Sequence, residues 1–151
     1  MITVNGLAEL TALTGRDLGH SSWIEITQGR IDTFAEATGD HQWIHVDPER
    51  ARSGPFGTTI AHGYLTLSLV IPLFGELLTI DGVRMGINYG LDKVRFPSPV
   101  RVGSKIRLAA RVAGVEEVAG NGVQLALDFT VEIDGEAKPA CVARPVYRHY
   151  V

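Results

Sequence analysis

The sequence predicts an α+β domain in which a curved antiparallel sheet wraps around one long central apolar helix. Residues 63–78 predict the helix, because they are apolar on nearly every side, as in helices that other elements surround. Residues 106–112 and 123–133 predict the sheet, because apolar side chains alternate there with mostly polar ones. Since the sheet's apolar face needs covering and the helix needs surrounding, wrapping one around the other buries both.

Short elements are expected in the N-terminal part of the chain. Leucines at helical spacing in residues 7–13 predict a first helix, and residues 21–27 predict a short strand. A second helix follows, with Thr27 as its expected N-cap and Gly39 directly after its C-terminus. The chain beyond is expected to be mostly loop, interrupted by a short helix that begins at Asp47-Pro48-Glu49.

The C-terminal half is expected to form a meander of antiparallel strands. Gly120-Asn121-Gly122 and Asp134-Gly135 supply the positive φ angles that hairpin turns need. The last strand, around 137–150, is predicted less strongly, because Pro139 and Pro145 cannot donate to a ladder. Strands that alternate, instead of being continuously apolar, argue against a parallel nucleotide-binding sheet.

Composition favours an intracellular globular protein. The 151 residues fit a single domain over 1–151, and 45% apolar with 21% charged residues argues against disorder and coiled coil. A net charge of −3 argues against nucleic acid as a partner. The N-terminus lacks the basic start of a signal peptide. The apolar run at residues 64–80 is too short and too interrupted to span a membrane. The single cysteine, Cys141, is expected to be a buried apolar residue. We therefore expect a cytoplasmic protein with no membrane partner.

Asp40 and His45 are the best candidates for acid–base chemistry. They lie five residues apart just after a helix, in a segment expected to be loop, where two such side chains can converge on one water molecule. A carboxylate and an imidazole form a workable pair, because histidine titrates near neutral pH. The structural alternative is that Asp40 caps the turn region of residues 47–53 and His45 packs against Trp43.

A metal site is the weaker interpretation of the same segment. His41 and His45 have i, i+4 spacing and Asp47 is close by, but Gln42 stands where a zinc-protease helix carries glutamate. No cysteine pair is available, and Asp47 is better explained as an N-cap. No metal is expected.

His62 and Gly63 open the apolar helix. The first turn of a helix presents free N–H groups and partial positive charge, and glycine lets a ligand approach the backbone closely. The Gly63 N–H is therefore a candidate oxyanion donor. The alternative is that Gly63 only lets the helix pack tightly against the sheet.

One segment of the chain is strongly basic. Residues 93–111 contain six basic and no acidic side chains, although the whole chain is acidic. A solvated sheet face is the common explanation, and a patch for a ligand with several phosphates is the sharper one. The candidates for such a patch are Lys93, Arg95, Arg101 and Lys105.

Three motifs in order resemble the MaoC-like (R)-specific enoyl-CoA hydratases, known as the hydratase 2 family. Residues 39–51 (GDHQWIHVDPERA) are similar to the family motif G-D-x-N-P-[LIV]-H-x-D-P-x-x-A. Residues 60–65 (IAHGYL) resemble the family's helix start, and residues 94–103 (VRFPSPVRVG) its strand and proline turn. The likeness covers roughly residues 17–150.

The resemblance implies a hot-dog fold, a homodimer with continuous sheets and a role in fatty-acid metabolism. The implied reaction is reversible syn hydration of trans-2-enoyl-CoA to (R)-3-hydroxyacyl-CoA, without metal or cofactor, since coenzyme A is part of the substrate. Asp40, His45 and the Gly63 N–H would be catalytic. Gln42 and His62 would contact the substrate, and the basic segment would meet the phosphates of coenzyme A. The acyl chain would enter a channel beside the apolar helix.

The sequence departs from the family where Gln42-Trp43 replaces the usual Asn-Pro, which affects the expected substrate preference more than the reaction. Three alternatives stay open. They are a hot-dog acyl-CoA thioesterase, a 3-hydroxyacyl-carrier-protein dehydratase and a non-catalytic subunit that binds acyl thioesters. Joint retention of Asp40 and His45 counts against the first and the last of these.

Overall fold

The structure is a computed structural model that describes residues 1–150. Its main feature is a curved sheet with strand order β2-β6-β7-β8-β5, in which the short β3 also pairs with β6. All the pairings in this sheet are antiparallel. The strands are β2 (Asp17–His20), β3 (Ile24–Glu25), β5 (Met85–Arg95), β6 (Lys105–Val118), β7 (Gly122–Ile133) and β8 (Cys141–Tyr150).

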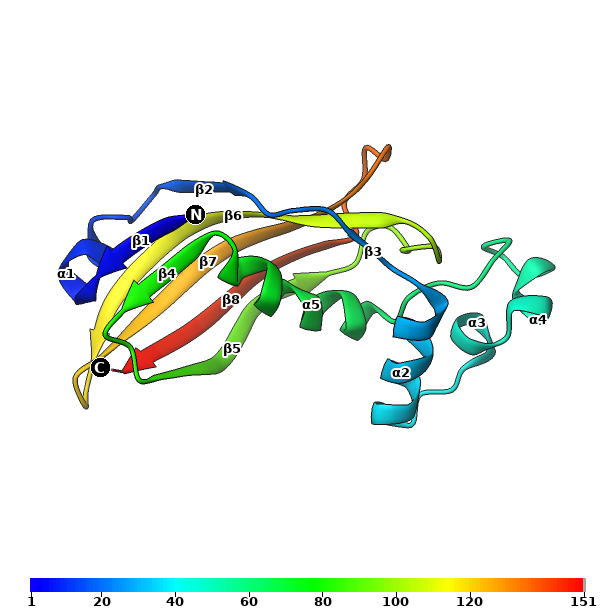
Figure 1. Cartoon of the computed structure of the whole chain (residues 1–151), viewed down its shortest axis with the longest axis horizontal. Helices are drawn as coiled ribbons and strands as arrows, with labels where there is room; N and C mark the ends of the chain where they lie inside the picture. The colour runs from blue at the N-terminus through cyan, green and yellow to red at the C-terminus, as the bar shows by residue number, and fades with distance from the viewer. Residues whose placement is uncertain (151) are drawn as a thin grey trace.

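Helix α5 (Gly63–Gly75) lies against one face of this sheet, and the core forms between them (Figure 1). Every second residue of β7 is buried, and the ring centroid of Phe129 on this strand lies 5.3 Å from that of Phe74 on α5. Cys141 is also buried, which raises the pKa of its thiol to about 11. The predicted α+β hot-dog arrangement is therefore confirmed.

Two expectations about α5 are wrong. The helix ends at Gly75, because Leu78 begins β4 (Leu78–Asp81), which pairs in parallel with β1 (Ile2–Asn5). The helix is also not surrounded, because Tyr64 is 71% exposed and Ile71 is 43% exposed. These two residues lie seven positions apart, and so share one side of the helix. The other elements leave that strip of α5 open.

Helices α2, α3 and α4 gather beyond one end of the sheet, and α1 lies at the opposite end (Figure 1). Helix α2 (Gln28–Thr38) begins and ends as predicted, since the Thr27 side chain accepts from the Arg30 N–H and Gly39 takes a φ of 76°. The predicted helix at Asp47 is α4 (Pro48–Arg52). The remaining helices are α1 (Gly6–Thr11) and α3 (Trp43–Val46), and α3 places His45 in a helical turn instead of the expected loop.

The strands differ from expectation at three places. The predicted strand 21–27 shrinks to β3, because the Ser21 hydroxyl takes the Leu108 N–H that a ladder bond would use. Strand β8 lies inside the sheet despite Pro145, where the pairing with β7 is interrupted. Strand β5 was not predicted in full, and it forms a long, exposed edge. The predicted turn is confirmed at Gly120 and Asn121, which have φ angles of 84° and 57°.

Within residues 1–150, no helix is both long and apolar enough to cross a membrane.

Candidate active site

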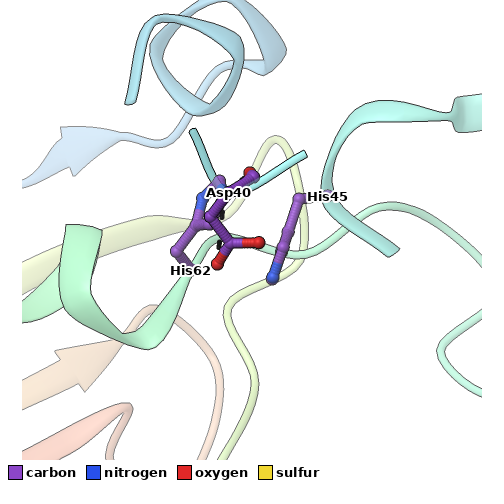
Figure 2. A group of neighbouring side chains, drawn as sticks. All are labelled: Asp40, His45 and His62. Atoms are coloured by element: carbon purple, nitrogen blue, oxygen red, sulfur yellow. Dashed lines mark hydrogen bonds and ion pairs between the residues drawn. The ribbon is translucent and has the colours of Figure 1, made fainter. Parts of the chain in front are cut away.

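Three chain segments bring Asp40, His45 and His62 together (Figure 2). The left-handed backbone of Gly39 ends α2 and turns the chain into Asp40, α3 carries His45, and His62 directly precedes α5. The nitrogen and oxygen atoms that these side chains offer lie within 4.8 Å of one another. Asp40 and His45 therefore lie close together, as their spacing predicts, and the start of α5 adds a second imidazole, that of His62.

His45 is buried, and its ring is held in one orientation. Its Nδ1 lies 2.7 Å from the main-chain oxygen of Ile60, which can only accept, so Nδ1 carries the proton and Nε2 is left with a free lone pair. Burial is the main cause that lowers the pKa of His45. The hydrogen bond to Ile60 opposes this shift, and the nearby His62 and Asp40 have smaller effects. A neutral imidazole with a free Nε2 is a proton acceptor at neutral pH.

The His62 side chain, only 3% exposed, lies at the back of the site. Its Nε2 lies 2.9 Å from the main-chain oxygen of Asp40 and therefore donates to it, and its Nδ1 is buried without a partner. The His62 ring stacks on His45, with ring centroids 3.8 Å apart and planes at 23°. His62 thus holds the Asp40 main chain and one face of His45, and its contact with substrate stays a prediction.

The Asp40 carboxylate lies beside the two stacked rings (Figure 2). Its side chain is 53% exposed, one oxygen lies 4.0 Å from Nε2 of His62, and Oδ1 accepts from the Gln42 N–H at 3.4 Å. Asp40 therefore does not cap α4, a role that Asp47 fills by accepting from the Arg50 N–H at 3.0 Å. The structural alternative of a capping Asp40 is wrong.

Two cavities meet at His45, Gly63 and Phe96. The first, of about 520 Å³, also includes Asp40 and His62 in its lining, and the second, of about 390 Å³, extends past Ile60. The Phe96 ring lies on Gly63 so closely that an added Cβ would be 3.2 Å from it. Gly63 thus lies at the junction of both cavities, in the first turn of α5, and it also allows the close packing of Phe96.

The three clustered side chains suit proton transfer better than metal ligation. Imidazole lone pairs lie in the ring plane, and the nearly parallel, stacked rings of His45 and His62 direct them side by side. A zinc ion must lie in both ring planes, about 2.0–2.1 Å from each nitrogen. One nitrogen of each ring is also already bonded to a main-chain oxygen.

The metal set weighed from the sequence is not assembled either. His41 is exposed and lies 3.6 Å from Glu36, while Asp47 caps α4. The alternative packing of His45 on Trp43 is also wrong. The Trp43 ring lies against Gly54 and under the Arg50 guanidinium, 4.4 Å from the ring centroid.

The basic segment does not form one patch. Lys93 and Arg95 lie on β5 and Lys105 begins β6, with β7 and β8 between these strands. Strands are spaced about 4.8 Å apart, so roughly 14 Å separates the two sets. Arg101 lies 3.7 Å from Glu136, an acid that is distant in sequence. Of the candidates, Arg95 directly precedes Phe96, which lines both cavities.

Several lining residues were not anticipated. The first cavity is also lined by Phe34, Thr38 and Tyr64. Helical spacing identified Phe34 only as a helix residue, and the packing of α2 against the start of α5 gives it a place in the site. The side chain of Gln42 does not line either cavity.

Comparison with known proteins identifies the family of the chain. A family model described as the MaoC like domain matches residues 9–132. The chain is 53% identical over 149 residues to 3-hydroxyacyl-thioester dehydratase Z of Mycobacterium tuberculosis, covering 99% of both chains. It is 46% identical over 139 residues to nodulation protein N of Rhizobium leguminosarum bv. viciae, covering 91% of this chain and 86% of that protein. The chain therefore belongs to the MaoC-like dehydratase family.

Solved structures show the same fold. The (R)-hydratase from A. caviae involved in PHA biosynthesis superimposes with a TM-score of 0.71 at 24% identity, covering 89% of this chain and 94% of that one. The monoamine oxidase regulatory protein from Archaeoglobus fulgius gives a TM-score of 0.78 at 22% identity, covering 100% and 99%. Fold and family together support an enzyme of the hydro-lyase kind.

Proposed function

We propose that this protein catalyses the reversible syn hydration of a trans-2-enoyl-CoA to an (R)-3-hydroxyacyl-CoA. The observation that carries the proposal is the convergence of a carboxylate, Asp40, and a buried neutral imidazole, His45, beside the N-terminus of α5. Hydration of a conjugated thioester needs three groups: an acceptor for the water proton, a group that orients the water, and a hydrogen-bond donor to the carbonyl oxygen.

The proposed reaction begins with water held by Asp40 and His45. Nε2 of His45 takes one proton as the water oxygen bonds to C3, and the electron pair of the double bond moves onto the thioester as an enolate. The imidazolium then returns the proton to C2, and the neutral imidazole is restored. Both new bonds form on the face where Asp40 and His45 lie, so the addition is syn.

The first N–H of α5 supports the same step. Negative charge builds on the carbonyl oxygen as the enolate forms, and the Gly63 N–H, at the positive end of the helix dipole, is the proposed donor. Removing a comparable donor in other enzymes costs about 3–4 kcal/mol of transition-state stabilisation.

The proposed chemistry uses no metal or redox cofactor, since coenzyme A enters as part of the substrate. We propose that the acyl chain lies in a third cavity of about 260 Å³ beside α5, lined by Leu67, Ile71, Leu91 and other residues of α5, β5 and β8. For the phosphates of coenzyme A, Arg95 is the best-placed cation of the basic segment.

A homodimer is part of the proposal. Strand β5 is an edge of the sheet with eleven residues, and Ile87, Tyr89 and Leu91 on it are each more than two-fifths exposed. An edge of this length offers unpaired N–H and C=O groups to another strand. A second copy that pairs along β5 would satisfy them and would also cover the open strip of α5.

The proposed reaction can run in either direction. Dehydration of a 3-hydroxyacyl thioester is the reverse of the same steps, and the name of the M. tuberculosis relative favours that direction and leaves the thiol carrier unspecified. A dehydratase for carrier-protein thioesters is therefore the second candidate.

An assay with crotonyl-CoA and longer trans-2-enoyl-CoAs tests the proposal. Loss of the conjugated double bond without release of free thiol is the expected result. Release of free thiol would instead indicate a thioesterase, and activity only on carrier-protein thioesters would favour the second candidate. No reaction with either thioester would indicate a subunit that binds and does not catalyse.

A further inference from the structure

Gln28 joins two segments of the site without reaching the cavity. It is the first residue of α2 and is half-buried. Its Nε2 donates to the main-chain oxygen of His45 at 2.8 Å and to Oδ1 of Asp32 at 2.8 Å. Its Oε1 accepts from Oγ1 of Thr59 at 2.5 Å. One amide therefore uses both of its donors and its oxygen.

The two segments that Gln28 joins are the two that orient His45. The first is α3, which carries His45 itself. The second is the extended chain at Thr59, whose neighbour Ile60 accepts from Nδ1 of His45 and donates its own N–H to Ile44 at 3.0 Å. Thr59 is fully buried, so its hydroxyl has no water to replace Gln28. The amide, the His45 main chain and the Ile60 carbonyl thus form a closed arrangement around the imidazole.

We propose that Gln28 is a positioning residue for His45, which fixes the distance between α3 and the Ile60 carbonyl and so the direction of Nε2. This proposal rests on the proposed acid–base role of His45. Nothing in the sequence pattern marked Gln28, because it lies far from the motif segment and at the start of another helix.

An amide is required at this place on chemical grounds. The His45 main-chain oxygen needs a donor and the Thr59 hydroxyl needs an acceptor, and one neutral amide supplies both. Glutamate would keep the acceptor but lose the donor, and it would place a negative charge beside the His45 oxygen and Asp32. Methionine would keep the length of the side chain and lose both bonds.

The test compares Gln28→Met and Gln28→Glu with the control Asp32→Ala. Asp32 is an exposed partner of the same amide, and its loss leaves the bonds to His45 and Thr59 in place. Both Gln28 variants should lower kcat by about 10–100-fold, the scale of small misplacements of a reacting group. Their KM should change little, because no contact with the substrate is removed. The Asp32→Ala variant should keep kcat within about twofold.

NMR titration of the His45 ring gives a second readout that does not need turnover. Burial is the main cause that lowers its pKa, and Asp40 and His62 are the titratable groups that face it. A loosened α3 would admit water, so the pKa of His45 should rise toward its ordinary value in both Gln28 variants. A purely structural residue would lower the melting temperature and leave kcat per folded molecule and this pKa unchanged.

Folded Gln28 variants with wild-type kcat and an unshifted His45 pKa would overturn the proposal. Failure of both variants to fold would overturn it too, because Gln28 would then be a general structural residue. If the wild-type protein hydrates no enoyl-CoA, the proposed function fails, and the His45 titration still decides whether Gln28 positions the ring.

Discussion

A histidine that accepts a proton near neutral pH must be neutral and must present one ring nitrogen to the reacting molecule. His45 meets both requirements through separate features. Burial keeps the imidazole neutral, and the Ile60 carbonyl takes the Nδ1 proton, so Nε2 is the nitrogen with the free lone pair. Asp40 is half-exposed and keeps its oxygens available to a water molecule.

The acid–base pair is tested by Asp40→Asn and His45→Gln. Each should lower kcat by at least about 100-fold, because each removes a group that either orients the water molecule or accepts its proton. Circular dichroism and sedimentation should show an unchanged fold and assembly. His41→Gln is the matched control, since this histidine of the same segment is exposed and lies beside Glu36. Near wild-type hydration by either Asp40→Asn or His45→Gln would remove that residue from the mechanism.

At the residue scale, the sequence points to the reactive side chains of the site more readily than to the residues that hold those side chains in place. Asp40 and His45 could be paired because their spacing is short and their side chains are reactive. The contacts of His62 with Asp40 and His45 cross 22 and 17 positions, and no local pattern encodes such distances. Gln28 is less predictable still, because a glutamine in the first turn of a helix is ordinary.

At the scale of elements, glycines and caps made the boundaries predictable where they acted locally. Thr27, Gly39 and Asp47 mark helix ends in the structure as they do in the sequence. The end of α5 was not predictable from apolarity, because Leu78 is as apolar in β4 as it would be in a helix. Pairing with the distant β1 decides between them.

The sequence of strand β5 does contain the alternating pattern that predicts a strand. Met85, Ile87, Tyr89 and Leu91 alternate with polar residues and glycine, which is the period of a strand. Gly86 and Gly90 weaken this pattern, because glycine is uncommon inside strands, and the apolar helix just before it draws attention away from it. The basic segment misled in another way, because the chain order of its cations does not show that β5 and β6 are separated by two strands.

The separation of β5 from β6 yields a prediction about coenzyme A. Arg95→Gln should raise KM for the enoyl-CoA several-fold at low ionic strength with little change in kcat, because phosphate contacts are shared by the ground and transition states. The increase should shrink at high salt. Lys105→Gln on β6, opposite Glu25, is the control and should leave KM unchanged. An unchanged KM in Arg95→Gln, and in the corresponding variants of Lys93 and Arg101, would exclude a phosphate-binding role. The basic side chains would then be explained as a solvated surface of the sheet.

At the scale of the whole molecule, the exposed apolar groups concentrate on β5 and on the open strip of α5. Such groups are costly in water and typical of surfaces that meet a partner. A second copy placed along β5 would extend the sheet and bring two sites into one assembly.

Sedimentation equilibrium tests this assembly. The wild-type protein should sediment with the mass of two 16.3 kDa chains at micromolar concentration. Ile87→Asp and Leu91→Asp should shift it to one chain, because each places a charge in the proposed interface. Ala119→Asp in the exposed β6–β7 turn is the control and should remain paired. A wild-type mass of one chain would contradict the homodimer.

Two histidines, the buried His45 and the half-buried His149, couple folding to pH. Burial lowers the pKa values of His45 and His149 in the folded protein. Below an ordinary histidine pKa of about 6.5, the unfolded chain therefore binds protons that the folded chain excludes, so the free energy of unfolding should decrease as pH falls from 7 to 5. Urea unfolding at the two pH values measures the change.

The variant His149→Phe should make this pH dependence shallower, because it removes one of the two groups that charge on unfolding. Equal slopes in the wild type and His149→Phe would show that His149 does not contribute.

The stereochemistry of addition in D₂O is the most direct test of the account. Because Asp40 and His45 lie together and serve both new bonds, the account predicts (R)-3-hydroxyacyl-CoA with deuterium at C2 on the same face as the hydroxyl. NMR of the product after chiral separation reads both centres at once. An (S)-product, anti placement of the deuterium, or a free acid in place of the hydroxyacyl thioester would contradict it.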